Sequence, residues 1–150
     1  MQTYWRHLKN EARGAAVIEL AVAIPLLLLL TVGAADFGRA FYQSVTISHA
    51  AETGAVYGAQ NNITSGHNSE MTQMARDDAA DVGTVTVTPT RVCKCPDGAE
   101  VNCVTGACTG YGAPRVYVSC QVQKSFNGLT RFPGMPNGFM VRRKVFMRVQ

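Results

Sequence analysis

A carboxylate in the apolar N-terminal part of this chain needs a chemical explanation. Glu19 is the single charged residue between Ala15 and Ala35. A charge in hydrocarbon costs a few kcal/mol on insertion scales, so a partner of opposite charge is expected. Cleavage of the chain after Gly14 would supply one, because it would free the α-amino group of Ala15 one helical turn from Glu19. Alternatively, Glu19 lies shallow enough in a bilayer for its carboxylate to reach the lipid headgroups.

Cysteines are the second chemically informative group, and all five lie between residues 93 and 120. Their clustering among turn-forming residues indicates disulfides and an oxidising compartment, and the odd count leaves at least one thiol free or joined to another chain. Their spacing does not match the paired arrangement of zinc ribbons, so neither a metal nor another cofactor is expected. The sequence cannot fix the pairing; a working assignment joins Cys103 to Cys108 and Cys120 to either Cys93 or Cys95.

The remaining residues with catalytic chemistry form no known active-site pattern. The histidines, His7, His49 and His67, lack a serine and an aspartate at motif spacing, so no hydrolytic triad is predicted. The sequence contains no P-loop, and the kinase-like tripeptide at 36–38 stands without the other kinase motifs. A net charge of +4 is too small to indicate a nucleic-acid partner, and the basic cluster 142–144 is expected on an exposed strand face. A protein that is not an enzyme is therefore predicted.

The apolar segment has the length of a transmembrane helix. At about 1.5 Å per residue, Ala15–Ala35 would span roughly 30 Å, the thickness of a bilayer core. Three basic residues precede it, Arg6, Lys9 and Arg13. By the positive-inside rule, the N-terminus lies in the cytoplasm and the remainder of the chain outside it. Asp36 and Arg39 follow the segment and are expected to pair at the helix exit.

A helical pattern continues beyond this segment. Residues 36–60 place apolar side chains at helical spacing, which predicts one unbroken helix of about 45 residues in total. Pro25 lies inside it and should bend it or loosen a turn. Gly54 and Gly58 stand four residues apart among alanines, so this face of the helix could approach another backbone closely.

The C-terminal part, 61–150, is predicted to be a small α+β domain. A short second helix is expected over 69–82, with Ser69 as its N-cap. Alternation of apolar and polar residues predicts three strands, at 84–92, 115–126 and 139–149, with a Cys-rich loop between the first two. We expect a small antiparallel sheet whose apolar face packs on the amphipathic half of the long helix.

The N-terminal residues resemble the type IV prepilins, whose short basic leader ends in the glycine after which a prepilin peptidase cuts. Within that class the chain resembles the TadE-like pseudopilins, which are minor pilins of tight-adherence (Flp) pilus systems. The resemblance covers residues 13–60 and is carried by Arg13-Gly14, Glu19, Pro25 to Leu30, Asp36 to Tyr42, and the alanine-rich helix to Ala59. Leu20, where many major Flp pilins have Tyr, and the substantial C-terminal domain favour a minor subunit.

This resemblance implies a non-enzymatic subunit that takes part in pilus assembly. It is expected in the inner membrane before assembly and in the pilus afterwards. Its expected parts are a leader (1–14), a transmembrane helix (15–35), an amphipathic continuation (36–60) and an extracytoplasmic domain (61–150). The implied partners are a prepilin peptidase, the major Flp pilin, a sister pseudopilin, the inner-membrane assembly platform and, before assembly, membrane lipid. Two alternatives stay open: a domain secreted by signal-peptidase cleavage near 32–34, or one held by an uncleaved anchor.

Overall fold

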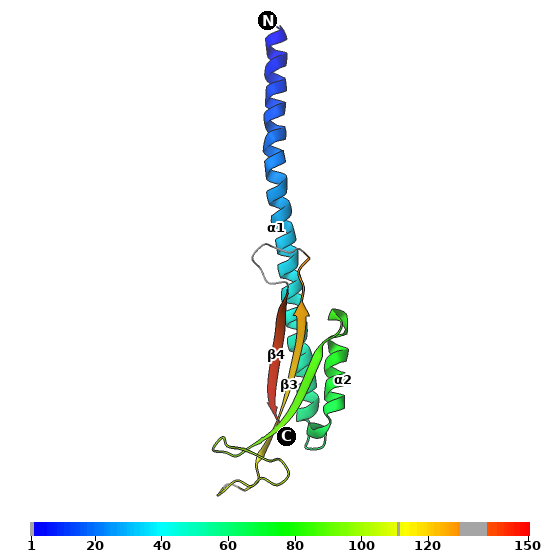
Figure 1. The fold of residues 1–150 in the computed structure, drawn as a ribbon, viewed down its shortest axis with the longest axis vertical. Helices are drawn as coiled ribbons and strands as arrows, with labels where there is room; N and C mark the ends of the chain where they lie inside the picture. The colour runs from blue at the N-terminus through cyan, green and yellow to red at the C-terminus, as the bar shows by residue number, and fades with distance from the viewer. Residues whose placement is uncertain (1, 111, 130–137) are drawn as a thin grey trace.

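A computed structural model of the protein describes residues 2–110, 112–129 and 138–150, with side chains from residue 14 onward. A single long helix, α1, extends far beyond a small domain that packs on its C-terminal part (Figure 1). The elements in chain order are α1 (Gln2–Ala59), η1 (Thr64–Gly66), α2 (Asn68–Asp78), η2 (Ala80–Val82), β1 (Thr86–Lys94), β2 (Glu100–Val101), β3 (Arg115–Phe126) and β4 (Phe139–Arg148). The predicted α+β fold with its long N-terminal helix is confirmed.

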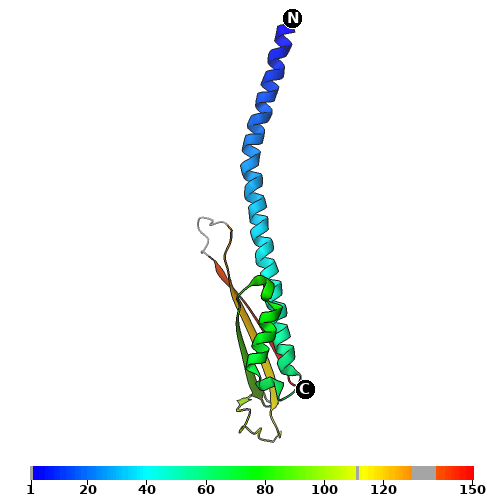
Figure 2. The same cartoon turned by 90° about the vertical axis from the view of Figure 1, so that its right-hand side faces the viewer.

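Helix α1 is continuous over 58 residues. It is longer than predicted because residues 2–13, the predicted leader, are helical too. The leader before Gly14 contains neither proline nor glycine, so nothing in its sequence interrupts the helix. Pro25 lies inside α1, and the helix curves gently without a break (Figure 2).

The strands form one antiparallel sheet in the order β2-β1-β3-β4. β3 is central and pairs with β1 on one side and β4 on the other; Val122, for example, lies opposite Val87 and Arg143. The three predicted strands are present, and β2 is an addition. A strand of two residues is too short to show the alternation that would reveal it in a sequence.

One face of this sheet packs against α1, as predicted, and it also packs against α2 (Figure 2). On the helix side, the core between the layers consists of Ile47 and alanines, and most of its other side chains are branched or aromatic. Its buried members are Ile47, Ala50, Ala51, Ala55, Ala75, Ala79, Val85, Cys120, Val122, Phe126 and Val141. Alanines on α1 and α2 let the helices lie close to the sheet.

The N-terminus of α2 differs from the prediction. The helix begins at Asn68, and His67 occupies the N-cap position without a side-chain capping bond. Ser69 is therefore not the N-cap; it lies inside the first turn, where its hydroxyl donates a hydrogen bond of 2.7 Å to the Glu70 carboxylate. This bond lowers the pKa of Glu70 below its ordinary value.

The close approach predicted at Gly54 and Gly58 is confirmed. A Cβ on Gly54 would lie 2.7 Å from the Cys120 sulfur and 3.0 Å from the Met71 carbonyl oxygen. A Cβ on Gly58 would lie 2.7 Å from the Met71 thioether. The two glycines thus let α1 fit against both α2 and β3.

Gly54→Ala is expected to lower the free energy of unfolding by about 1–3 kcal/mol, because the added methyl group meets backbone and a buried sulfur. Gly38→Ala is the matched control on the same helix, since a Cβ there meets nothing within 4 Å. It should be neutral or stabilising by up to about 1 kcal/mol. Chemical denaturation of the full chain in detergent measures both. Equal midpoints for the two variants would show that the Gly54 contact is not tight.

Candidate functional site

The apolar half of α1 is exposed along its whole length. The large side chains from Val17 to Leu30 all lie at the surface of the described chain. An 18-residue stretch here has a mean hydropathy of 2.5, and none of it is buried. By length and composition this helix could cross a membrane. So large an unpartnered apolar surface must be covered by lipid or by other protein.

Three residues predicted to carry chemistry lie together at the start of this surface. Ala15 and Glu19 are one turn apart on α1, about 6 Å along its axis. Glu19 is exposed, and within the described side chains no ion pair joins it to another residue. A Cβ on Gly14 would meet nothing within 4 Å, so packing within the chain does not require glycine there. Processing at Gly14 and pairing at Glu19 stay predictions.

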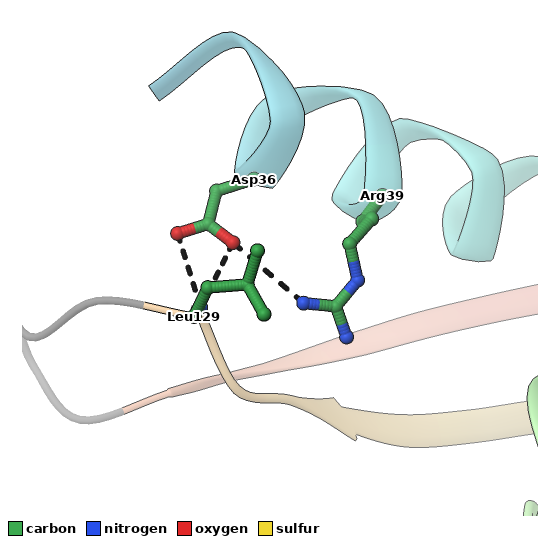
Figure 3. A network of polar contacts seen from close by, with 3 residues as sticks. All are labelled: Asp36, Arg39 and Leu129. Atoms are coloured by element: carbon green, nitrogen blue, oxygen red, sulfur yellow. Dashed lines mark hydrogen bonds and ion pairs between the residues drawn. The ribbon is translucent and has the colours of Figure 1, made fainter. Parts of the chain in front are cut away.

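The apolar surface ends at a polar network on the first turn beyond it. The Asp36 carboxylate accepts the Leu129 backbone N–H, at 2.8 and 3.1 Å from its two oxygens, and pairs with Arg39 at 3.7 Å (Figure 3). The Asp36 side chain is only 13% exposed. Arg39 lies 6.0 Å from the ring centroid of Phe126, which contacts Phe139. This network fixes the β3–β4 end of the sheet to α1.

The Asp36–Arg39 pair was predicted from its spacing and is confirmed. The contact between Asp36 and Leu129 was not predicted, because these two residues are 93 positions apart and a backbone N–H carries no signal in the sequence.

Residues 14–56 match the family model described as TadE-like protein. This part of the chain is therefore similar to the TadE-like proteins. The matched segment runs from Gly14 through Glu19 and the Asp36 network into the helical face that carries the domain. This match confirms the resemblance predicted from the N-terminal motifs. No curated protein and no solved structure gives a significant match to the chain.

The basic cluster 142–144 is divided between two faces of the sheet. Arg142 and Lys144 lie on the outer face, whereas Arg143 points to α1 and donates to Ser44 at 2.7 Å and to Ser48 at 3.2 Å. The expectation of one exposed face for all three was wrong. Alternation along β4 puts Arg143 on the same side as Val141 and Val145, and as β4 is an edge strand its guanidinium still reaches water.

The Cys-rich loop contains two disulfides, Cys93–Cys103 and Cys95–Cys108. The working assignment, with Cys103 joined to Cys108 and Cys120 to the Cys93–Cys95 pair, was wrong. In the sheet Cys93 lies opposite Val116. Cys120 is four residues further along β3, about 13 Å away and beyond the reach of a disulfide. Both bonds instead tie the loop back to the end of β1.

Cys120 is the free cysteine, and it is buried against Gly54. Burial raises the pKa of its thiol to about 11. Because the thiolate is the reactive form, we expect Cys120 to resist alkylation in the native protein at mildly alkaline pH and to react once the chain is unfolded without reductant. Mass spectrometry would detect one added group per chain. Rapid modification of the native protein would contradict its burial.

Potential metal ligands do not gather elsewhere in the described part of the chain, where no group of three His, Cys, Asp or Glu side chains is placed to hold an ion. Among the described residues, the polar network and the two disulfides are the other sets of predicted residues that the structure brings together. The candidate site is therefore the N-terminal half of α1, with its glycine, its carboxylate and its exposed apolar surface.

Proposed function

We propose that this protein is a pseudopilin, a minor-pilin subunit that takes part in assembling a tight-adherence (Flp) pilus. A prepilin peptidase would cut it after Gly14, so that the mature chain begins at Ala15. The observation that carries this proposal is the TadE-like match, which begins at Gly14 and covers an apolar helix surface without a partner in the described chain.

The apolar surface serves in two environments. Before assembly it lies in the inner membrane, with the N-terminus in the cytoplasm and the domain outside. Disulfides in the domain suit that oxidising side. During assembly the helix leaves the bilayer laterally and exchanges lipid for the helices of neighbouring subunits. Because helix packing replaces lipid contacts with protein contacts of similar polarity, the apolar residues alone do not set the position of one subunit against the next.

Glu19 sets the position of one subunit against the next. Once the chain begins at Ala15, its α-amino group is positive and lies one turn from a carboxylate. The amine of one subunit can pair with Glu19 of a neighbour only when the two helices have the correct axial offset. A misplaced subunit would leave a charge unpaired among apolar side chains, which is costly. The pair therefore selects the register of the helices in the filament.

This role is structural, and catalysis belongs to the partners. The peptidase removes the leader, and an inner-membrane assembly platform with its own ATPase drives extraction of the helix. The other partners are the major Flp pilin and a sister pseudopilin. The domain on α1 faces outward, away from the packed helices.

The N-terminus of the mature protein tests the proposal directly. A chain isolated from membranes of the native cell should begin at Ala15. A chain that begins at Ala35 or Asp36 would mean cleavage by signal peptidase and release of a secreted domain. A chain that retains Met1 would mean an uncleaved anchor. Intact-mass measurement and N-terminal sequencing distinguish the three, and the leader should persist in a strain that lacks the prepilin peptidase.

A further inference from the structure

The charges of the domain are segregated along the chain. Residues 51–100 contain seven acidic and three basic residues, whereas residues 101–150 contain seven basic residues and no aspartate or glutamate. Two ion pairs form within the described chain, Asp36–Arg39 on α1 and Lys94–Glu100 between β1 and β2. Among the described residues, therefore, no ion pair joins the acidic part of the domain to its basic part.

A basic row lies on the outer face of the sheet, on the side away from α1 and α2 (Figure 2). Lys144, Phe146 and Arg148 alternate along β4 with Val145, which packs on the core, so all three point to the outer face. They are exposed, and the Phe146 side chain is 59% exposed. The Lys144 ammonium lies 4.5 Å from the centroid of the Phe146 ring and keeps its charge there. The row thus presents two cations about 14 Å apart with an aromatic ring between them.

An acidic row lies on the other side of the domain, on the solvent-facing side of α2. Glu70, Met74 and Asp77 follow the spacing i, i+4, i+7, so they share one face of the helix, and all three are exposed. The core side of the helix carries Ala75 instead. Two carboxylates about 10 Å apart therefore flank an apolar side chain that is 42% exposed. Arg76 is the single basic residue of α2.

Both rows lie beside the same part of α1 (Figure 1). The basic row extends along it between two hydrogen bonds, one from Arg143 to Ser48 and one from Gln150 to Ala59. The acidic row lies along the same stretch, beside the contacts of Asp78 with Thr53 and of Met71 with Gly58. Two copies with parallel α1 helices at one height would therefore bring the two rows to a similar level.

We propose that a second copy of this chain docks its α2 on the outer face of the sheet. In this contact Met74 lies against Phe146, and the two carboxylates beside Met74 pair with Lys144 and Arg148. A thioether on an aromatic ring is a favourable contact, and the flanking charges select the orientation. Since the two faces differ, each copy keeps one face of either kind free, and the copies form an open row.

The strength of this contact rests on the proposed membrane insertion of α1. An exposed ion pair contributes little by itself, but copies that α1 holds in one membrane meet at a high effective concentration. Gly14 and Glu19 take no part in the contact. A chain that keeps its leader should therefore form the same row, so a failure of this contact and a failure of the processing proposal are separate results.

Cross-linking of the full chain in its membrane tests the contact. Chains with Met74→Cys and chains with Phe146→Cys, distinguished by tags, are produced together and treated with a short bis-maleimide. The native cysteines do not interfere, because Cys120 is buried and the others form disulfides. A dimer that carries both tags should form, and a chain with both substitutions should give a series of larger multimers.

Leu129→Cys is the matched control for Met74→Cys. Its side chain is 64% exposed, but it lies at the level of Asp36, about 25 Å along α1 from Thr53. An equal yield with this control would mean random collision, and a dimer from Phe146→Cys chains alone would mean contact between two sheets. Either result overturns the proposal, as does the absence of a mixed dimer. Adducts of Phe146→Cys with a different membrane protein only would assign the face to that protein.

Charge reversal tests the pairing of the rows. Glu70→Lys with Asp77→Lys on the Met74→Cys chain should reduce the mixed dimer about tenfold or more, because like charges then face each other. Lys144→Glu with Arg148→Glu on the Phe146→Cys chain should restore the dimer with that variant, which would also show that the reversed chain is folded. A yield that the first reversal leaves unchanged, or that the second does not restore, would overturn the pairing.

Discussion

Gly14→Leu should leave the entire pool of this protein unprocessed in the membrane. A peptidase that cuts after a glycine needs a residue without a side chain at that point, and leucine would fill the space. The chain itself tolerates the change, since a Cβ at Gly14 meets nothing within 4 Å and α1 is already helical there. Intact-mass measurement should find the leader on every chain, with insertion and fold unchanged.

Gly33→Leu is the matched control for this experiment. It lies on the same helix, and a Cβ there also meets nothing within 4 Å, but it is remote from the predicted cleavage point. This variant should be cut as efficiently as the unaltered chain. Normal maturation of Gly14→Leu would refute cleavage after Gly14, and loss of maturation in both variants would indicate a general defect in membrane insertion.

Glu19→Ala should be processed normally and yet fail to support pilus assembly. Removal of one partner of a buried ion pair costs about 3–5 kcal/mol, since the other charge is left without compensation. At about 1.4 kcal/mol for each tenfold change, the subunit would join a filament roughly 100-fold less well or worse. Quantitative surface piliation in a strain that carries only the variant measures this loss.

Glu52→Ala is the control for the carboxylate. Glu52 also lies on α1 and is exposed, but it falls beyond the apolar segment. Its removal should leave assembly unaltered. Glu19→Asp keeps the charge on a shorter side chain and should restore part of the assembly. Unchanged surface piliation in Glu19→Ala would remove the role assigned to the carboxylate in selecting the register.

Much of the fold could be predicted because it depends on local patterns. The alternation over 115–126 coincides with β3, and the helical spacing beyond Ala35 predicted the end of α1 to within a residue. The glycines at 54 and 58 indicated close packing because a glycine within an alanine-rich helix has few other reasons to be there. Each of these features is determined by residues near one another in the chain.

What could not be predicted depends on register and on distant contacts. The disulfide pairing follows from the alignment of β1 with β3, which places Cys93 opposite Val116 and not near Cys120. The orientation of Arg143 follows from the position of β4 beside α1, and the Asp36–Leu129 contact from the path of the chain after β3. The candidate site at Gly14–Glu19 was accessible to sequence reasoning because its chemistry requires a spacing of one helical turn and no tertiary contact.

The attachment of the domain at both ends has a mechanical consequence. The Leu129 N–H binds Asp36 at one end, and the Gln150 N–H binds the Ala59 carbonyl at 3.2 Å at the other. The sheet therefore lies in parallel with about 35 Å of helix. Part of a tension along α1 would pass through the chain between Leu129 and Gln150, which contains all of β4. The folded domain would thus stiffen the part of α1 that it covers.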